Sequence, residues 1–362
     1  MKTLNLIFVG FGNVGREVSR LLWSNREEFA RQGLSTRAVA IVTGRHGTLL
    51  DEGGIDLLAA AANDRFPGSQ SALDVIASVK ADVVLELTTL DVKSGQPAIS
   101  HVKTALRSGK HVVSANKGPV AWAYQELSEI AQENRRMFLF ESTVMDGTPV
   151  FNLAQHCLRG ARVTGFEGVL NSTTNFVLDE IASGSAFEDA VAEAQRRGVA
   201  EADPSMDIDG WDSAAKVAAL ANVLMGAQTN PLAVSRVGIG GITRQDFARA
   251  ARRGETIKLV CRAWRSQEAG TGEDRLPGDV LPGEPQRDDA QPSEAGGKIQ
   301  MTVAPEQVPR GSLLATVRGT SSVLVIKTDL MGDIGIVEQD PSLWQTAYGV
   351  ISDLIEIARS TP

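Results

Sequence analysis

The sequence predicts an α/β protein, with an N-terminal doubly wound parallel sheet followed by an α+β domain. Two observations support this prediction. Strand-like and helix-like segments alternate through residue 140, a pattern typical of a parallel sheet with helices on both faces. In addition, the β-prone run of residues 4–9 leads directly into a glycine-rich turn. We expect domain limits of 1–147, 148–318 and 319–362, with the last segment returning to the first domain.

The composition is that of a soluble globular protein. A chain of 362 residues is long enough for two or three domains with their own cores. The formal net charge of -8 argues against nucleic acid or an anionic membrane as the main partner. The N-terminal apolar run is too short for a signal peptide, and no other run approaches a membrane span. Cys157 and Cys261 have no metal or redox spacing, so we expect two buried free thiols in a reducing cytoplasm.

The glycine-rich turn reads Gly10-Phe11-Gly12-Asn13-Val14-Gly15 and precedes a helix expected from Arg16 to Leu22, extending toward Phe29. Between a strand and a helix, this spacing is the dinucleotide-binding fingerprint of a Rossmann-type domain. Gly10 allows the tight turn, Gly12 lets the backbone approach a pyrophosphate, and Gly15 lets helix and strand pack closely. The helix N-terminus offers free N–H groups to the phosphates. The alternative is a flavodoxin-like turn without a ligand.

The residues after the second expected strand, 38–42, bear on the choice of cofactor. An acidic residue there would bind the ribose 2′-hydroxyl of NAD, but the chain has Thr43-Gly44-Arg45-His46. A guanidinium accommodates a 2′-phosphate better than a carboxylate does. The sequence therefore favours NADP(H), with NAD as the other possibility; the alternative is that Arg45 is a solvated loop residue.

Further α/β units follow, with strands expected at 81–87, 111–114 and 137–140 and helices at 99–108 and 121–133. Ligands of such sheets lie at the carboxyl ends of the strands. That rule assigns Thr88, Thr89, Ser114 and Lys117 to the nicotinamide end of the crevice. The alternative for Lys117 is a solvated side chain in a polar turn.

An acidic stretch, residues 198–216, places five carboxylates ahead of one lysine: Glu201, Asp203, Asp207, Asp209 and Asp212 before Lys216. Such a cluster raises the pKa of a nearby lysine and keeps its proton available for donation. A substrate amino group would balance the negative charge. The alternative is a simple i,i+4 ion pair between Asp212 and Lys216 on a solvated helix.

The second domain is expected to contain strands at 165–170, 299–303, 313–317 and 322–328 and helices at 186–196, 213–225 and 342–359. Residues 266–298 are rich in glycine, proline and acid and have few large apolar side chains. Such a composition predicts an exposed loop; an acidic docking surface is the alternative. Open sheet edges in this domain favour a homodimer.

Together these motifs resemble homoserine dehydrogenase. Matching segments occur in order along the whole chain: 10–15, 114–121, 141–144, 168–176, 198–216, 238–239, 257–260 and 345–347. The resemblance implies that Lys216 exchanges a proton with the substrate oxygen and that Lys117 is the second active-site lysine. Glu201, Asp207 and Asp212 match residues that hold the amino acid or position the lysine, and Ser172 and Thr173 lie where the family contacts substrate. Glu141, Val144, Asp146 and Thr148 fall where the family binds a structural sodium ion, largely through backbone oxygens.

The chain departs from the family pattern in three places. Asn171-Ser172-Thr173 stands where Asn-Gly-Thr is usual, and Met145-Asp146-Gly147 replaces a small, glycine-rich turn. The sequence ends at Pro362 without room for a C-terminal ACT domain, so threonine feedback through such a module is not expected.

The resemblance implies NADP(H)-dependent interconversion of L-homoserine and L-aspartate 4-semialdehyde, in threonine, methionine and isoleucine biosynthesis. One alternative is a paralogue acting on a related amino or hydroxy aldehyde. Another is a non-catalytic NADP(H)-binding regulator, although a regulator would not need both Lys117 and Lys216.

Overall fold

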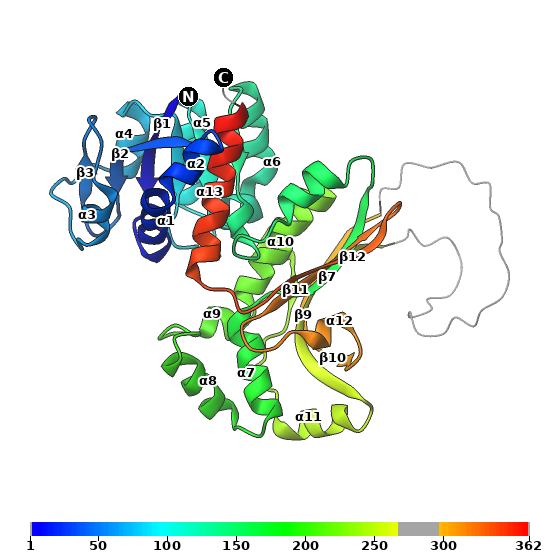
Figure 1. Ribbon diagram of the computed structural model, residues 1–362. Helices are drawn as coiled ribbons and strands as arrows, with labels where there is room; N and C mark the ends of the chain where they lie inside the picture. Colours follow the sequence, from blue (N-terminus) through cyan, green and yellow to red (C-terminus); the bar gives the residue numbers. More distant parts are fainter. Residues whose placement is uncertain (1, 267–296, 361–362) are drawn as a thin grey trace, which may run out of the picture.

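The computed structural model describes residues 2–266 and 297–360, which build two six-stranded sheets (Figure 1). The first sheet has the strand order β3-β2-β1-β4-β5-β6. Its parallel strands are β1 (Thr3–Val9), β2 (Ser35–Val42), β4 (Val83–Glu86), β5 (His111–Ser114) and β6 (Phe138–Leu139). The order reverses between β1 and β4, as in a doubly wound sheet. The α/β class with a Rossmann-type first domain is confirmed.

The edge strand β3 (Thr48–Leu50) corrects the expectation of a purely parallel sheet, because it runs antiparallel to β2. The connection is only residues 43–47, where the Thr43 hydroxyl donates to the Gly47 carbonyl oxygen at 3.0 Å. So short a link can form a hairpin but cannot cross over to a parallel neighbour.

Helices cover both faces of the first sheet. On one face lie α1 (Asn13–Ser24), α2 (Arg26–Arg31), α3 (Leu57–Ala61) and the C-terminal α13 (Leu343–Ser360); on the other lie α4 (Ala72–Ser78), α5 (Ala98–Arg107) and α6 (Gly118–Glu133). Because side chains alternate along a strand, Leu6 and Phe8 pack with α1 and α13, whereas Ile7 and Val9 face the opposite core. Figure 1 shows α13 beside α1, as expected for the last helix. The helix expected to extend to Phe29 is instead interrupted at Asn25.

The second sheet has the order β12-β11-β7-β9-β10-β8 and is antiparallel except for the β10–β8 pair. Its strands are β7 (Val163–Val169), β8 (Ser235–Arg236), β9 (Glu255–Arg265), β10 (Ile299–Pro309), β11 (Ser322–Thr328) and β12 (Gly332–Glu338). Its helices are α7 (Ser172–Ala182), α8 (Phe187–Arg196), α9 (Ser205–Ile208), α10 (Trp211–Met225), α11 (Arg244–Ala251) and α12 (Leu313–Thr316). Short helical turns occupy Glu141–Thr143, Leu153–Cys157 and Pro231–Ala233.

Three expectations about this half were wrong. The strand expected at 313–317 is absent, because residues 313–316 form the helix α12, in which the Ala315 N–H donates to the Ser312 carbonyl oxygen. So short an apolar run does not distinguish a helix from a strand. Cys157 is exposed, at the end of a turn whose residue Leu158 faces inward instead. The return to the first domain begins later than residue 319, since β11 and β12 pair within the second sheet and only α13 crosses back.

Helices α6 and α10 join the two halves. The Asn222 amide on α10 donates to the carbonyl oxygens of Val120 and Ala121 on α6, at 3.0 and 3.2 Å. This contact holds the two helices together behind the site described below. Among the described residues, no helix has the length and apolar character of a membrane span.

The expected loop 266–298 lies outside the described residues except at its ends. There β9 and β10 are paired to their tips, with Arg265 opposite Ile299 and the Ser266 N–H donating to the Lys298 carbonyl oxygen at 3.0 Å. Deleting residues 270–294 is expected to leave folding and dehydrogenase activity largely intact, since a shorter loop joins two ends that are already adjacent. Thermal melting and activity of the deletion protein, beside the full chain, provide the check. Insolubility or loss of most activity would mean that the segment contributes to the folded body.

Candidate active site

The centre of the site is Asp212, which contacts a lysine from each half of the protein. Lys117 follows β5 and precedes α6; its Nζ lies 2.9 Å from Asp212 Oδ1. Lys216, one turn along α10, has its Nζ 3.5 Å from Asp212 Oδ2. All three side chains are largely buried, with exposures of 16–18%. The two lysines expected at one crevice are therefore brought together by a shared carboxylate.

Asn171 fixes the position of Asp212 from the other side. Its Oδ1 caps α7 by accepting from the Thr174 N–H at 2.8 Å. Its amide donates to Asp207 Oδ1 at 2.7 Å and to Asp212 Oδ2 at 3.1 Å. Lys216 Nζ also donates to the neighbouring Leu170 carbonyl oxygen at 2.6 Å. One asparagine thus ties the start of α7 to both inner carboxylates.

The electrostatics keep Lys216 charged. Burial alone would lower its pKa, but the negative charges of Asp212, Asp146 and Asp207 outweigh burial and raise the pKa above its ordinary value. Burial likewise opposes ionisation of Asp212, yet Lys117 and Lys216 hold the pKa of that carboxyl well below its usual range. The result is a buried carboxylate between two ammonium groups, one of which is a candidate proton donor.

Only two of the five carboxylates in the acidic stretch, Asp207 and Asp212, belong to this cluster. Burial and the charge of Asp212 raise the pKa of Asp207. Glu201, Asp203 and Asp209 are exposed, and no described side-chain contact joins them to Lys216. The expectation of one five-carboxylate cluster was therefore wrong, because α9 turns the chain between its acidic residues. The proposed role of Glu201 in binding substrate stays a prediction.

The hydroxyl groups of Ser172 and Thr173 are directed to backbone partners. Ser172 donates to the Thr320 carbonyl oxygen at 2.9 Å and Thr173 to that of Val199 at 3.2 Å. Both residues start α7, next to Asn171, so they border the carboxylate cluster. Their contact with substrate stays a prediction.

The glycine turn has the geometry that its sequence predicts. Gly10 has φ +89°, and a Cβ there would lie 2.7 Å from the Leu87 backbone. A Cβ on Gly12 would meet nothing within 4 Å, which leaves open space before α1, whose N-terminus has no side-chain cap. A Cβ on Gly15 would lie 3.3 Å from the Gly10 carbonyl oxygen, so this helix packs closely on the turn. Free N–H groups facing open space fit a pyrophosphate.

The other residues of the glycine-rich turn either pack against the apolar core or begin α1. Phe11 stacks edge-on against Phe8 and Phe66, with ring centroids 5.6 and 5.8 Å apart. Asn13 begins α1, and Val14 packs against the apolar core beneath it. Arg45 is exposed in the turn between β2 and β3, on the side of the sheet expected to bind adenosine.

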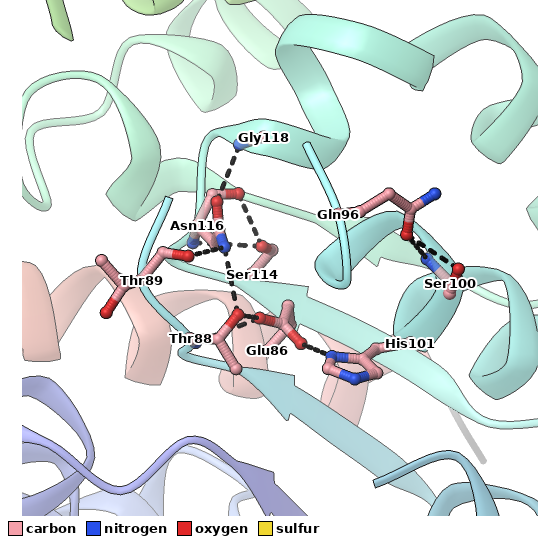
Figure 2. Close-up of polar contacts among 9 residues, drawn as sticks. All are labelled: Glu86, Thr88, Thr89, Gln96, Ser100, His101, Ser114, Asn116 and Gly118. Atoms are coloured by element: carbon pink, nitrogen blue, oxygen red, sulfur yellow. Dashed lines mark hydrogen bonds and ion pairs between the residues drawn. The ribbon is translucent and has the colours of Figure 1, made fainter. Parts of the chain in front are cut away.

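The ends of β4 and β5 form a polar network (Figure 2). Asn116 donates to the Thr88 hydroxyl at 3.2 Å and to the Thr89 carbonyl oxygen at 3.3 Å, while its Oδ1 accepts from the Gly118 N–H at 2.8 Å. The Ser114 hydroxyl donates to the Asn116 carbonyl oxygen at 2.9 Å. All four residues expected at the nicotinamide end, Thr88, Thr89, Ser114 and Lys117, thus lie at one edge of the sheet.

Sequence reasoning missed Glu86 and His101 in this network. Glu86 Oε2 lies 2.8 Å from His101 Nδ1, and Glu86 Oε1 accepts from the Thr88 N–H at 3.0 Å. The feature of the sequence that could have drawn attention to Glu86 is a single carboxylate at the end of an otherwise apolar strand.

The residues expected to bind sodium form two separate sets of contacts. The Glu141 carboxylate accepts the N–H groups of Val150, Phe151 and Asn152 at 2.6–2.8 Å. Asp146 accepts from the Thr346 hydroxyl at 2.6 Å, and Thr148 donates to Glu338 Oε1 at 2.9 Å. Val144 is buried beside them.

Glu338, also missed from the sequence, has a raised pKa of about 7 because of burial and of repulsion from Asp146. Among the described residues, no group of three or more His, Cys, Asp or Glu side chains could hold a metal. A site made of backbone oxygens is not tested by that result.

The comparisons with known proteins point to the same family along almost the whole chain. Residues 149–355 match the family model of homoserine dehydrogenase, and residues 10–141 match that of its NAD binding domain. A homoserine dehydrogenase of Methanocaldococcus jannaschii is 34% identical over 99% of both chains. An NAD(+)-dependent homoserine dehydrogenase of Pseudomonas canavaninivorans is 32% identical over 99% of this chain and 97% of its own.

The similarity extends to solved structures. The crystal structure of a putative homoserine dehydrogenase from Archaeoglobus fulgidus superposes with a TM-score of 0.82 at 28% identity, covering 98% of this chain and 99% of the other. The family models, the full-length relatives and this fold agree with the two-lysine site. The chain belongs to the homoserine dehydrogenase family of NAD(P)-dependent oxidoreductases.

Proposed function

We propose that this enzyme interconverts L-homoserine and L-aspartate 4-semialdehyde with NADP(H), in threonine, methionine and isoleucine biosynthesis. The observation that carries the proposal is the Lys117–Asp212–Lys216 arrangement beside the carboxyl ends of β4 and β5. Absorbance at 340 nm with homoserine and either NADP or NAD tests it directly. No reduction of either nucleotide by homoserine would contradict the proposal.

Each side chain has a distinct task in the proposed reaction. When bound, the nicotinamide supplies or accepts the hydride. In the direction of aldehyde reduction, Lys216, held protonated by its carboxylate neighbours, gives its proton to the carbonyl oxygen. In the direction of homoserine oxidation, the neutral amine of Lys216 receives the proton of the substrate hydroxyl group. The positive charge of Lys117 stabilises the negative charge that develops on that oxygen. Asp212 keeps both ammonium groups in place.

Substrate binding is proposed to use the remaining groups. The carboxylates of Asp207 and Asp212 can accept from the α-amino group, with Glu201 joining them when substrate is present. The N–H groups at the start of α7, around Ser172 and Thr173, can bind the α-carboxylate. A paralogous activity on a related aldehyde is the second candidate, because Ser172 replaces a glycine and bonds Thr320. Steady-state rates with a panel of short amino alcohols separate the two.

We propose that the Arg45 guanidinium binds the 2′-phosphate of NADP. Replacing Arg45 by alanine is expected to weaken NADP(H) binding more than NAD(H) binding, by roughly 1–2 kcal/mol for a direct charged contact. Dissociation constants of both nucleotides provide the measurement. Arg31→Ala is a matched control, since Arg31 pairs with Glu28 on α2. Equal losses of affinity for NADP and NAD in Arg45→Ala would contradict this role. The comparison matters because one relative is an NAD(+)-dependent homoserine dehydrogenase.

Three further properties are proposed. A homodimer is supported by the two edge strands of the second sheet, β12 and β8. A cytoplasmic location is supported by two cysteines without a disulfide.

A structural sodium ion would be held by backbone oxygens of Glu141, Val144, Asp146 and Thr148, because the Glu141 carboxylate already accepts three N–H groups.

A further inference from the structure

Glu86 is a fully buried carboxylate that the proposed reaction does not use. It closes β4 and has 0% exposure. A buried carboxylate requires partners, and Figure 2 shows them on both of its oxygens. Oε2 faces His101 Nδ1 at 2.8 Å, while Oε1 accepts both the N–H and the hydroxyl of Thr88. Glu86 therefore determines how Thr88 presents its side chain.

The Thr88 hydroxyl is left with acceptor capacity only. A threonine hydroxyl has one proton and two lone pairs. The proton is donated to Glu86, and one lone pair accepts from the Asn116 amide at 3.2 Å. Exchanging the oxygen and nitrogen of the Asn116 amide would break two hydrogen bonds, because its oxygen accepts from the Gly118 N–H and its amide group donates to the Thr89 carbonyl oxygen. One lone pair of the Thr88 hydroxyl remains for a ligand.

The position of Thr88 indicates which ligand group it meets. The glycine turn after β1 fits the pyrophosphate, and the turn after β2 is on the adenosine side, so the nicotinamide half lies over β4 and β5. The carboxamide of nicotinamide carries N–H donors, which an acceptor-only hydroxyl can bind. Asn116 belongs to the same network and immediately precedes Lys117.

We propose that Glu86, supported by His101, is a positioning residue that fixes the Thr88 hydroxyl as the acceptor for the nicotinamide carboxamide. The inference rests on the proposed use of a nicotinamide dinucleotide but not on the choice between NADP and NAD. Through Asn116, the same network holds the turn that carries Lys117.

The test compares the binding of the dinucleotide with that of its 3-acetylpyridine analogue, in which a methyl group replaces the carboxamide NH2. The wild type is expected to prefer the carboxamide form by roughly three- to tenfold, the size of one net hydrogen bond. Thr88→Val and Glu86→Leu should bring the ratio of dissociation constants close to one. Glu86→Gln retains an oxygen that can accept from Thr88 and should preserve most of the preference.

Ser100→Ala is the matched control. Ser100 lies on the same helix as His101, but its hydroxyl donates to Gln96, which makes no contact with Glu86 or Thr88 (Figure 2). Its removal should leave the ratio unchanged. A folded Thr88→Val or Glu86→Leu with the wild-type ratio would overturn the proposal, as would Glu86→Gln losing the preference as fully as Glu86→Leu. If Glu86→Leu does not fold, Thr88→Val decides, since it removes only the hydroxyl. A wild type that binds neither nucleotide would contradict the proposed function instead.

Discussion

Replacing Lys216 by alanine is expected to lower kcat by at least ~100-fold, because general acid–base catalysis typically contributes 10² to 10⁴ in rate. Lys216 is the ammonium group whose pKa the surrounding carboxylates raise, and it is the proposed proton donor. Removing it also leaves Lys117 as the only charged partner of Asp212 among the residues that the structure describes. Affinity for the dinucleotide should change little, since Lys216 lies on α10 of the second domain, whereas the glycine turn joins β1 and α1 of the first domain.

The measurement is steady-state kinetics with homoserine, together with the dissociation constant of the cofactor. Lys103→Ala provides a matched control: that lysine pairs with Glu126, away from Asp212, and its loss should leave kcat unchanged. A Lys216→Ala enzyme with near-normal kcat would remove the catalytic assignment. A parallel loss of cofactor affinity would indicate a general disturbance of the fold rather than the loss of a proton donor.

The largest stability effect is expected from Lys258→Met. Lys258 has 0% exposure and donates to Asn175 Oδ1 at 2.6 Å, Asp179 Oδ1 at 3.0 Å and the Val317 carbonyl oxygen at 2.8 Å. Burial lowers the pKa of this lysine, whereas Asp179 opposes that effect. Methionine fills a similar volume but leaves Asn175 Oδ1 and the Val317 carbonyl oxygen without this buried donor, and it removes one of the charged partners of Asp179, which still accepts from Arg318 and from the Gly319 N–H. Breaking a buried pair in this way costs about 3–5 kcal/mol.

The urea midpoint of the second domain gives the measurement. Lys327→Met is the control, because Lys327 pairs with Glu167 on the surface with 42% of its side chain exposed, and such pairs contribute ~0–1 kcal/mol. We expect a large midpoint shift for Lys258→Met and little for Lys327→Met. Equal shifts would show that the three contacts of Lys258 contribute no more than an ordinary surface pair.

Local patterns predicted the elements that position the site. The glycine turn, β5 and α13 follow from short-range spacing, and the Asp212–Lys216 pair follows from one helical turn. The contact of Lys117 with Asp212 was expected only through the rule for strand ends, because 95 positions separate the two residues. Physical reasoning about short segments therefore identified the lysines but not the distance between them.

The features that sequence reasoning missed are partnerships between distant segments. Glu338 reaches Thr148 across 190 positions, and Glu86 meets His101 where a strand and a helix pack together. Each residue alone has the composition of an ordinary surface glutamate or histidine. The one local signal was the position of Glu86 at the end of an apolar strand. The partners of these side chains lie on other elements of the fold, so their contacts did not follow from local patterns.

The return of α13 to the first sheet also has a consequence during protein synthesis. Ala347, Val350, Ile351 and Leu354 complete the apolar layer that begins with Leu4 and Leu6. The domain that contains β1 therefore cannot finish its core until α13, which follows both sheets in the chain, has been translated. While the second sheet is being synthesised, this apolar layer lacks its covering helix, so synthesis of the nucleotide-binding domain starts before the second sheet is made and is completed after it.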